Sequence, residues 1–237
     1  MCEMFVYQLD SSGMNDSGSG TNRSGWPPGA SARREYERRR DARRARVLAR
    51  HPRFGRLLLA FSGPSVHDEN WRRGAEGEEQ AARRLNALLH GRGVVLVHDR
   101  RMPGSRANID HLAVGPGGVT VIDTKRMRGA VKIRRDGGLF SESRERLIVA
   151  GRDCTHLVEG VCRQVAVVSE LLGAGVGVIG AMCFVESELP LFSKPKLEGV
   201  RIAGPRGVAR LARRDGPHSP GEVHEIAERL RIALPEA

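Results

Sequence analysis

Two aspartates and a lysine stand at matching positions on the two sides of a glycine-rich turn. Asp110 lies in the run NIDHLAV, and Asp123 and Lys125 lie in the run VTVIDTK. The β-branched residues of both runs predict strands, and the sequence GPGG at 115–118 predicts a four-residue hairpin loop between them. In a hairpin closed there, Asp110 faces Asp123 and Asn108 faces Lys125. Since side chains alternate along a strand, the two carboxylates and the ammonium share one face of the sheet.

This register creates an electrostatic problem that a metal ion would solve. Opposed side chains have Cβ atoms about 4.5 to 5.5 Å apart, and like charges at that spacing destabilise a sheet. A divalent cation offsets the repulsion, because Mg²⁺ takes oxygen ligands from one or two carboxylates and leaves sites for phosphate oxygens. Two alternatives stay open: one aspartate is protonated, or both lie at a solvated strand end where Lys125 neutralises them. Because Asp123 lies on an apolar strand, where a purely structural charge cluster is costly, we favour a site for Mg²⁺ or Mn²⁺.

A third carboxylate is expected from a helix upstream of the strands. The segment from Trp71 to Gly93 has helical periodicity and ends in two glycines. Its apolar stripe contains Ala82, Leu85 and Leu89, and at 100° per residue Glu78 lies within about 40° of that stripe. We therefore predict that the Glu78 carboxylate points inward. The alternative is an acid of the first turn that only favours the helix dipole.

The remaining pattern predicts an α/β fold with three parts. Residues 1–30 are rich in Ser, Gly and Asn and predict a disordered tail; 31–62 predict an Arg-rich basic helical segment; 68–237 predict the globular domain. Within the domain we expect a meander of four strands, at 94–99, 108–114, 119–125 and 130–134. Helices are expected at 156–172, which carries Gln164, and from Pro220 to about Leu234, with Ser219 as the N-cap.

The charge of the chain indicates polyanionic partners. Lys and Arg number 39 against 28 Asp and Glu, which gives a net charge of +11. Residues 31–56 hold eleven Arg and three acids, a local charge of 11 − 3 = +8, and we predict a basic helix at 31–50. Nucleic acid is the first expected partner, through Arg–phosphate contacts, and an anionic membrane surface is the second. With an aromatic content of 4%, little base stacking is expected, so binding should be weakly sequence-specific.

Several classes of protein are excluded or disfavoured by the same sequence. No run of about 18 apolar residues is present, so no transmembrane segment is expected. The four cysteines form no CxxC pair, which disfavours a zinc ribbon and indicates reduced thiols. The N-terminus lacks the features of a signal peptide, and the expected location is the cytoplasm. His111 should point away from Asp110 and is interpreted as a packed or surface histidine.

The ordered set of these residues resembles a known family. A helix-borne Glu in GAEGE, then IDH, then DTK, resembles the PD-(D/E)xK nuclease superfamily, and ANIDHLAVGPGGVTVIDTK and GRDCTHLVEGVCRQVAVV are similar to the nuclease-related domain (NERD) family. The resemblance covers roughly residues 71–190. It implies a restriction-endonuclease-like core, in which a mixed sheet is flanked by helices, and metal-dependent phosphodiester hydrolysis. His156 departs from the family pattern, where a Lys is expected.

The resemblance also implies roles for individual residues. Asp110 and Asp123 would hold Mg²⁺, with the Thr124 carbonyl as a further ligand, and Glu78 would bind a second metal directly or through water. Lys125 would orient the attacking water or help to deprotonate it, and would stabilise charge on the phosphorane. Gln164 matches a glutamine often found beside such sites. Its alternative is a solvated amide on the helix surface.

Three functions follow as expectations. The leading one is an enzyme, a Mg²⁺-dependent nuclease whose expected substrate is DNA. The second is a catalytically inactive module that binds nucleic acid. The third is an interaction protein that the basic helix holds on an anionic membrane. The sequence leaves open DNA against RNA, strandedness and the oligomeric state.

Overall fold

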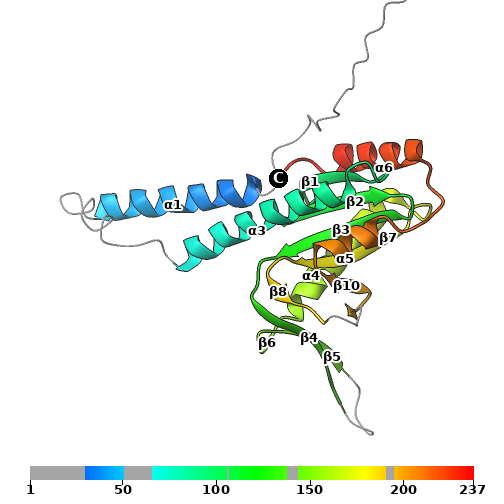
Figure 1. Ribbon diagram of the computed structural model, residues 1–237. Helices are drawn as coiled ribbons and strands as arrows, with labels where there is room; N and C mark the ends of the chain where they lie inside the picture. The colour runs from blue at the N-terminus through cyan, green and yellow to red at the C-terminus, as the bar shows by residue number, and fades with distance from the viewer. Residues whose placement is uncertain (1–29, 51–65, 106, 138–143, 191–194) are drawn as a thin grey trace, which may run out of the picture.

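The computed structural model describes residues 30–50, 66–105, 107–137, 144–190 and 195–237 (Figure 1). The predicted tail therefore lies outside the described residues except for Ala30, as does the 51–62 part of the basic segment. The helices are α1 (Ala30–Arg50), α3 (Val66–Leu89), α4 (His156–Leu172), α5 (Pro205–Ala212) and α6 (Pro220–Ala233). The strands are β1 (Val95–Arg101), β2 (Asn108–Gly115), β3 (Gly118–Lys125), β4 (Gly129–Asp136), β5 (Arg144–Val149), β6 (Arg152–Asp153), β7 (Val178–Phe184), β8 (Ser187–Glu188), β9 (Lys196–Leu197) and β10 (Val200–Ala203).

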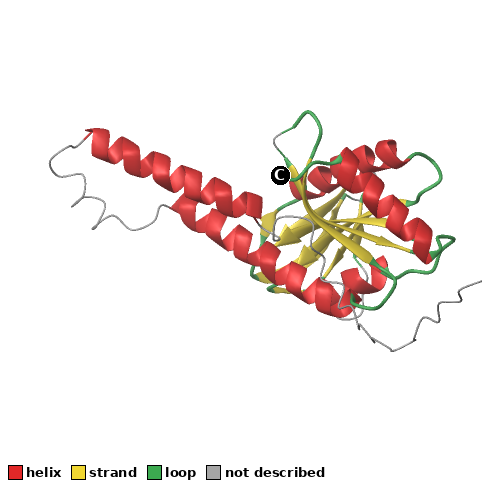
Figure 2. Ribbon diagram, turned by 90° about the horizontal axis from the view of Figure 1, so that it is seen from above, coloured by secondary structure: helices red, strands yellow, loops and turns green. Residues whose placement is uncertain are grey.

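The main sheet is mixed and has helices on both faces (Figure 2). Its strand order is β1-β2-β3-β7-β10-β9, with β1, β2 and β3 antiparallel and β7 parallel to both β3 and β10. Apolar side chains of one face pack against α3 and α5, and those of the other face pack against α4 and α6. This alternation follows from the period of two along each strand. The predicted α/β fold, a mixed sheet flanked by helices, is confirmed.

The predicted hairpin has the predicted register but a tighter turn. Val114 pairs with Val119 and Leu112 pairs with Val121. Gly115 and Gly118 also pair, so the turn consists of Pro116 and Gly117 alone, and the prediction of a four-residue loop is wrong. Gly118 has φ +98, and a Cβ there would lie 2.1 Å from the carbonyl oxygen of Gly177. A glycine is needed at this turn both for its backbone and for the close approach of the next loop.

The prediction of a four-strand meander is wrong at its last strand. The edge of β3 that a meander would give to β4 is occupied by β7, which runs parallel to it from Val119 to Lys125. After Lys125 the chain turns away, with Gly129 at φ +98, and β4 enters a second sheet of order β6-β5-β4-β8. Periodicity within a strand does not reveal its neighbours, and a long-range pairing decided this one.

The helices agree with the predictions except at one start. The basic helix, the helix at 156–172 and the capped C-terminal helix are confirmed, and Ser219 and Glu222 form a capping box at the start of α6. The helix expected to begin at Trp71 begins at Val66. In both views α1 runs alongside the N-terminal part of α3, and the pair extends from the domain as an arm (Figures 1 and 2). Arg33 of α1 forms an ion pair with Glu79 of α3.

Gly77 allows α3 to lie very close to the end of β3. A Cβ on Gly77 would be 2.7 Å from the Cβ of Arg126, the residue directly after β3. One turn further along α3, Ala81 and Ala82 are fully buried against the sheet. Small side chains at these positions bring the helix backbone close to the strand ends. Glu78, which directly follows Gly77, is thereby held near the acids and the lysine of the hairpin, with which it interacts electrostatically.

We predict that Gly77→Ala destabilises the protein while Gly74→Ala does not. The new methyl group at 77 must displace Arg126 or the helix, at a cost of about 1–3 kcal/mol. Gly74 lies in the same helix with nothing within 4 Å of the position that a methyl group would take, so alanine there should stabilise by up to about 1 kcal/mol. Urea denaturation of both variants measures the difference. Equal free energies of unfolding for the two variants would contradict the close packing.

Candidate active site

The end of β3 joins an acid, an ammonium and the backbone of the hairpin. Lys125 Nζ lies 2.7 Å from Asp123 Oδ2, so the two side chains point to the same side of the strand, as alternation predicts. The backbone N–H of Thr124 donates to Asp110 Oδ2 at 2.7 Å, which fixes the Asp110 carboxylate across the hairpin. The Asp123 and Lys125 side chains are 14% and 25% exposed. The site is therefore largely removed from water, yet still reachable at its edge.

Three carboxyl groups here are held against ionisation. Burial raises the pKa of Asp123 to about 6, with the Asp110 charge adding to the effect and Lys125 opposing it. Burial also raises the pKa of Asp110 and raises the pKa of Glu78 well above its usual range. In both cases the Asp99 charge acts in the same direction. At each of these groups, removal from water and repulsion by the other acids both raise the pKa, which indicates that the cluster lacks positive charge.

Lys125 supplies the positive charge that the cluster does hold. Burial opposes its charged form, but the carboxylates of Asp123, Asp110 and Glu78 outweigh this and raise the Lys125 pKa. The ammonium is thus positive at neutral pH in the metal-free chain. With Glu78, Asp99, Asp110 and Asp123 all ionised, the local charge would be 1 − 4 = −3. Such a balance attracts a cation.

Asp99 is a site residue that the sequence did not single out. Its side chain is buried, at 4% exposure, and its backbone has φ +50. The β1–β2 register pairs His98 with His111 and Arg100 with Ile109, which sets Asp99 opposite Asp110. A non-glycine residue in the left-handed region is uncommon and costs free energy, although Asp tolerates it better than most residues. The available signal was an acid that interrupts the apolar run VVLVHD, but the pairing of β1 with β2 was needed to give it meaning.

Gln164 lies inside the protein and anchors α4 to the start of β2. Its side chain is 6% exposed, and its Nε2 donates to the backbone carbonyl of Asn108 at 3.0 Å. The alternative of a solvated surface amide is therefore wrong. Its Oε1 atom is buried without a hydrogen-bond partner among the described residues. Since Asn108 is two residues before Asp110, this bond helps to position the strand that carries the carboxylate.

His111 is packed rather than exposed, as one of its two interpretations predicted. It is fully buried against His98, with ring centroids 5.0 Å apart and the two Nδ1 atoms 3.0 Å apart. Burial lowers the pKa of His98 to about 3 and that of His111 to about 4, so both rings are neutral at physiological pH.

The donor set fits a hard divalent cation, although the side chains are not yet arranged around one. Within the described part of the chain, no three His, Cys, Asp or Glu side chains are grouped tightly enough to hold an ion as they stand. Asp110 is engaged by the Thr124 N–H and Asp123 by Lys125. Carboxylate oxygens are nevertheless the ligands that Mg²⁺ and Mn²⁺ prefer, and the raised pKa values of Asp110 and Asp123 indicate a shortage of positive charge.

Comparison with known families places these residues in one domain. The family model described as "Nuclease-related domain" matches residues 73–185. This part of the chain belongs to the nuclease-related domain family. The match begins within α3, ends just after β7 and includes all of the candidate site residues described above, whereas α1, α5 and α6 lie outside it. Searches among curated proteins and among solved structures gave no match to the chain.

The raised pKa of Asp123 predicts a pH-dependent stability in chelator. A carboxyl whose folded pKa is about 6, against 3.8 unfolded, binds its proton more tightly in the folded state. Its contribution to stability is present at low pH and is lost as the pH rises through about 6. The melting temperature of the wild type relative to Asp123→Asn should therefore fall over this range.

Asp153 provides the matched control. It is exposed, and hydrogen bonds from Thr155 lower its pKa. Its contribution to stability is lost only as the pH falls below its unfolded pKa of 3.8. The difference in melting temperature between the wild type and Asp153→Asn should therefore stay constant between pH 4 and pH 7. If the difference in melting temperature between the wild type and Asp123→Asn stays constant between pH 4 and pH 7, Asp123 is not a buried ionisable group.

Proposed function

We propose that this protein hydrolyses phosphodiester bonds of nucleic acid in a metal-dependent reaction, with DNA as its substrate. The observation that carries the proposal is the Lys125 ammonium 2.7 Å from Asp123, beside Asp110 and Glu78, within a nuclease-related domain. Cation-seeking carboxylates beside a fixed ammonium suit a reaction that adds negative charge to a phosphate. A purely structural ion pair would not need the additional buried acids around it.

Oxygen atoms of Asp110, Asp123 and Glu78, with the Thr124 carbonyl, would hold Mg²⁺ or Mn²⁺. When bound, such an ion lowers the pKa of its water and polarises the phosphoryl oxygen. Asp99 adds negative potential at the same end of the sheet, because its charge raises the pKa values of Glu78 and Asp110. This potential favours occupancy of the site by a divalent cation.

The residues of the chain itself perform the remaining tasks. Lys125 presents a positive charge to the phosphate and stabilises the charge that develops on its non-bridging oxygens. The Thr124 N–H holds Asp110 in place, and the close approach at Gly77 holds Glu78 on the other side. Gln164 fixes the start of β2. Packing and backbone contacts thus hold the strands and the helix that carry these groups in place before substrate binds.

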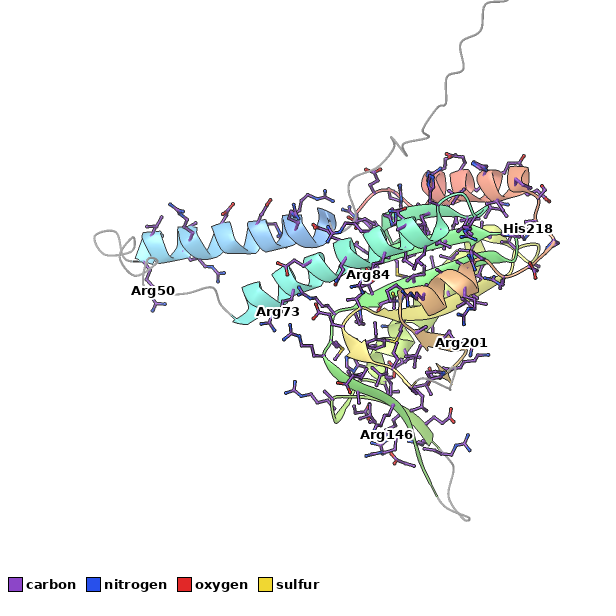
Figure 3. The ribbon with its side chains drawn as sticks, viewed as in Figure 1. Arg50, Arg73, Arg84, Arg146, Arg201 and His218 are labelled. Atoms are coloured by element: carbon purple, nitrogen blue, oxygen red, sulfur yellow. The ribbon has the colours of Figure 1, made fainter. Side chains whose placement is uncertain are left out.

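The basic arm supports nucleic acid as the partner. Helix α1 carries nine Arg and three acids, a charge of 9 − 3 = +6, and several of its arginines are exposed, including Arg44, Arg46 and Arg50. Figure 3 shows Arg50 at the outer end of the arm and Arg73 on the facing helix α3. Guanidinium groups spaced along a helix suit phosphates without reading bases, which agrees with the expected weak sequence specificity.

An anionic membrane surface is the competing partner for this arm. Among the helices that the structure describes, none is both long and apolar enough to cross a bilayer. Any membrane role for the arm would therefore be surface association through Arg. The polar composition of α1 offers few apolar side chains to insert, which favours nucleic acid.

Cleavage assays test the reaction directly. With Mg²⁺ or Mn²⁺ the wild type should cut duplex DNA, and chelator should stop it. Lys125→Met keeps the aliphatic stem but removes the charge, so turnover should fall by about a hundredfold or more while divalent binding is kept. Asp123→Asn should lose both turnover and the calorimetric signal of Mn²⁺ binding.

Lys196→Met is the matched control, because Lys196 is exposed on β9 and lies outside the cluster. Its turnover per bound substrate should equal that of the wild type. Wild-type cleavage by Lys125→Met would refute the role of the ammonium. Nucleic-acid binding by a wild type that never cleaves would favour the inactive binding module.

Removal of charge from the arm separates its two possible partners. The triple variant Arg44→Gln, Arg46→Gln and Arg50→Gln keeps helix-forming residues and leaves the Arg33–Glu79 contact intact. If the arm binds phosphates, the slope of log K against log salt should drop by up to about 2.7, since each duplex contact contributes about 0.9. Anionic vesicle binding that falls while the DNA slope is unchanged would assign the arm to membranes instead.

A further inference from the structure

The β4–β5 ribbon is a second projecting element beside the candidate active site. It belongs to the smaller sheet, and its two strands pair from Val131–Val149 to Asp136–Arg144. In Figure 1 the chain leaves β3 and turns into β4, which extends from the domain on a different side from the α1–α3 arm. Only three residues separate Lys125 from the start of β4. The ribbon therefore begins at the candidate active site.

One face of the ribbon is apolar up to the Arg135–Glu145 ion pair, and the other face is mainly cationic. Val131, Leu147 and Val149 are buried in the core cluster beneath α4, and Ile133 packs against it. The opposite face carries four cations and two acids, a charge of 4 − 2 = +2. Its charged members are Lys132, Arg134, Arg144, Arg146, Asp136 and Asp153, and the apolar Ile148 lies among them.

Arg134 and Arg146 are neighbouring cations on this face. They pair directly across the two strands, and like charges at that position destabilise a sheet. Asp136 lies 2.9 Å from Arg134 and 2.7 Å from Arg146, and Asp153 lies 3.5 Å from Arg146. These two acids offset the two arginines, so the net charge of +2 on the face equals that of Lys132 and Arg144. The Arg134 and Arg146 side chains remain 58% and 43% exposed. Figure 3 shows Arg146 on the ribbon, away from the main sheet.

We propose that this cationic face binds the phosphate backbone of duplex DNA and holds the substrate on the side of the active site away from the basic arm. The proposal rests on the proposed function for the choice of nucleic acid. A two-stranded ribbon has the width that the major groove of duplex DNA admits. Its side chains alternate, so cations recur along one face while Val131, Ile133, Leu147 and Val149 of the other face pack in the core.

The length of the ribbon sets the distance to this contact. Arg134 follows Lys125 by nine residues, and at about 3.3 Å per residue in a strand they lie at most about 30 Å apart. With about 3.4 Å of duplex per base pair, the contact lies within about nine base pairs of the phosphate at Lys125. A duplex that ends closer to the cleaved bond would not reach the ribbon.

The test measures binding of a fluorescent 30-base-pair duplex, about three helical turns, by the full chain in chelator between 50 and 200 mM salt. The Arg134→Gln, Arg146→Gln variant removes two phosphate contacts, each of which contributes about 0.9 to the slope of log K against log salt. Between 50 and 200 mM salt, the affinity of the wild type should therefore fall by about tenfold more than that of the variant. Arg206→Gln, Arg210→Gln is the matched control, since it removes the same charge from exposed positions on α5. Its salt dependence should equal that of the wild type.

Three results would overturn the proposal. They are an unchanged salt slope in the ribbon variant, an equal change in the α5 control, and a loss of binding to anionic phospholipid vesicles while DNA affinity stays the same. If the ribbon variant fails to fold, Lys132→Gln, Arg144→Gln removes the same charge from the same face and replaces it in the assay.

Binding and hydrolysis are tested independently of each other. If the ribbon variant changes DNA binding but the wild type does not cut DNA with Mg²⁺ or Mn²⁺, the ribbon contact is supported and the proposed hydrolysis is refuted. If the wild type cuts DNA but the ribbon variant binds DNA as the wild type does, the hydrolysis is supported and the ribbon contact is refuted.

Discussion

The uneven balance of buried charge at the end of β3 is the constraint on which the rest of the structure depends. One ammonium, Lys125, faces several carboxyl groups that burial holds against ionisation. A buried acid without a full complement of cations lowers stability, and a fold keeps one only where packing elsewhere compensates. The apolar clusters on both faces of the main sheet supply this compensation. The same imbalance that destabilises the metal-free chain is what would attract a divalent cation and a phosphate.

Two helices hold this charge in place by different means. Helix α3 approaches through residues without bulk, Gly77, Ala81 and Ala82, so that its backbone lies against the strand ends. Helix α4 acts through one buried amide, Gln164, which bonds to the backbone at the start of β2. A glycine contact fixes the distance between helix and sheet, and a hydrogen bond fixes the position of one strand. Together they restrict both sides of the carboxylate cluster.

The groups proposed for catalysis and for phosphate binding lie in different parts of the chain. The matched family domain contains the carboxylates and Lys125, whereas the arginine-rich helix α1 lies outside it. The β4–β5 ribbon lies inside the domain but outside the main sheet. This division suits contacts to a uniform phosphate backbone, which need reach and positive charge rather than exact geometry. The proposed reacting groups need fixed positions, and a backbone hydrogen bond at Asp110 and the close approach at Gly77 restrict them.

The sequence by itself determined the local structure, because local structure depends on near neighbours. Strand alternation and the glycine turn set Asp110 opposite Asp123, and helical periodicity directed Glu78 inward. The resemblance to nuclease-related domains added the roles expected of Thr124 and Gln164. Tertiary structure alone decided the place of Asp99, the departure of β4 into a second sheet, the burial of Gln164 and the contact at Gly77. Each of these depends on segments far apart in the chain, whose pairing is set by how the whole apolar core closes and not by any local pattern.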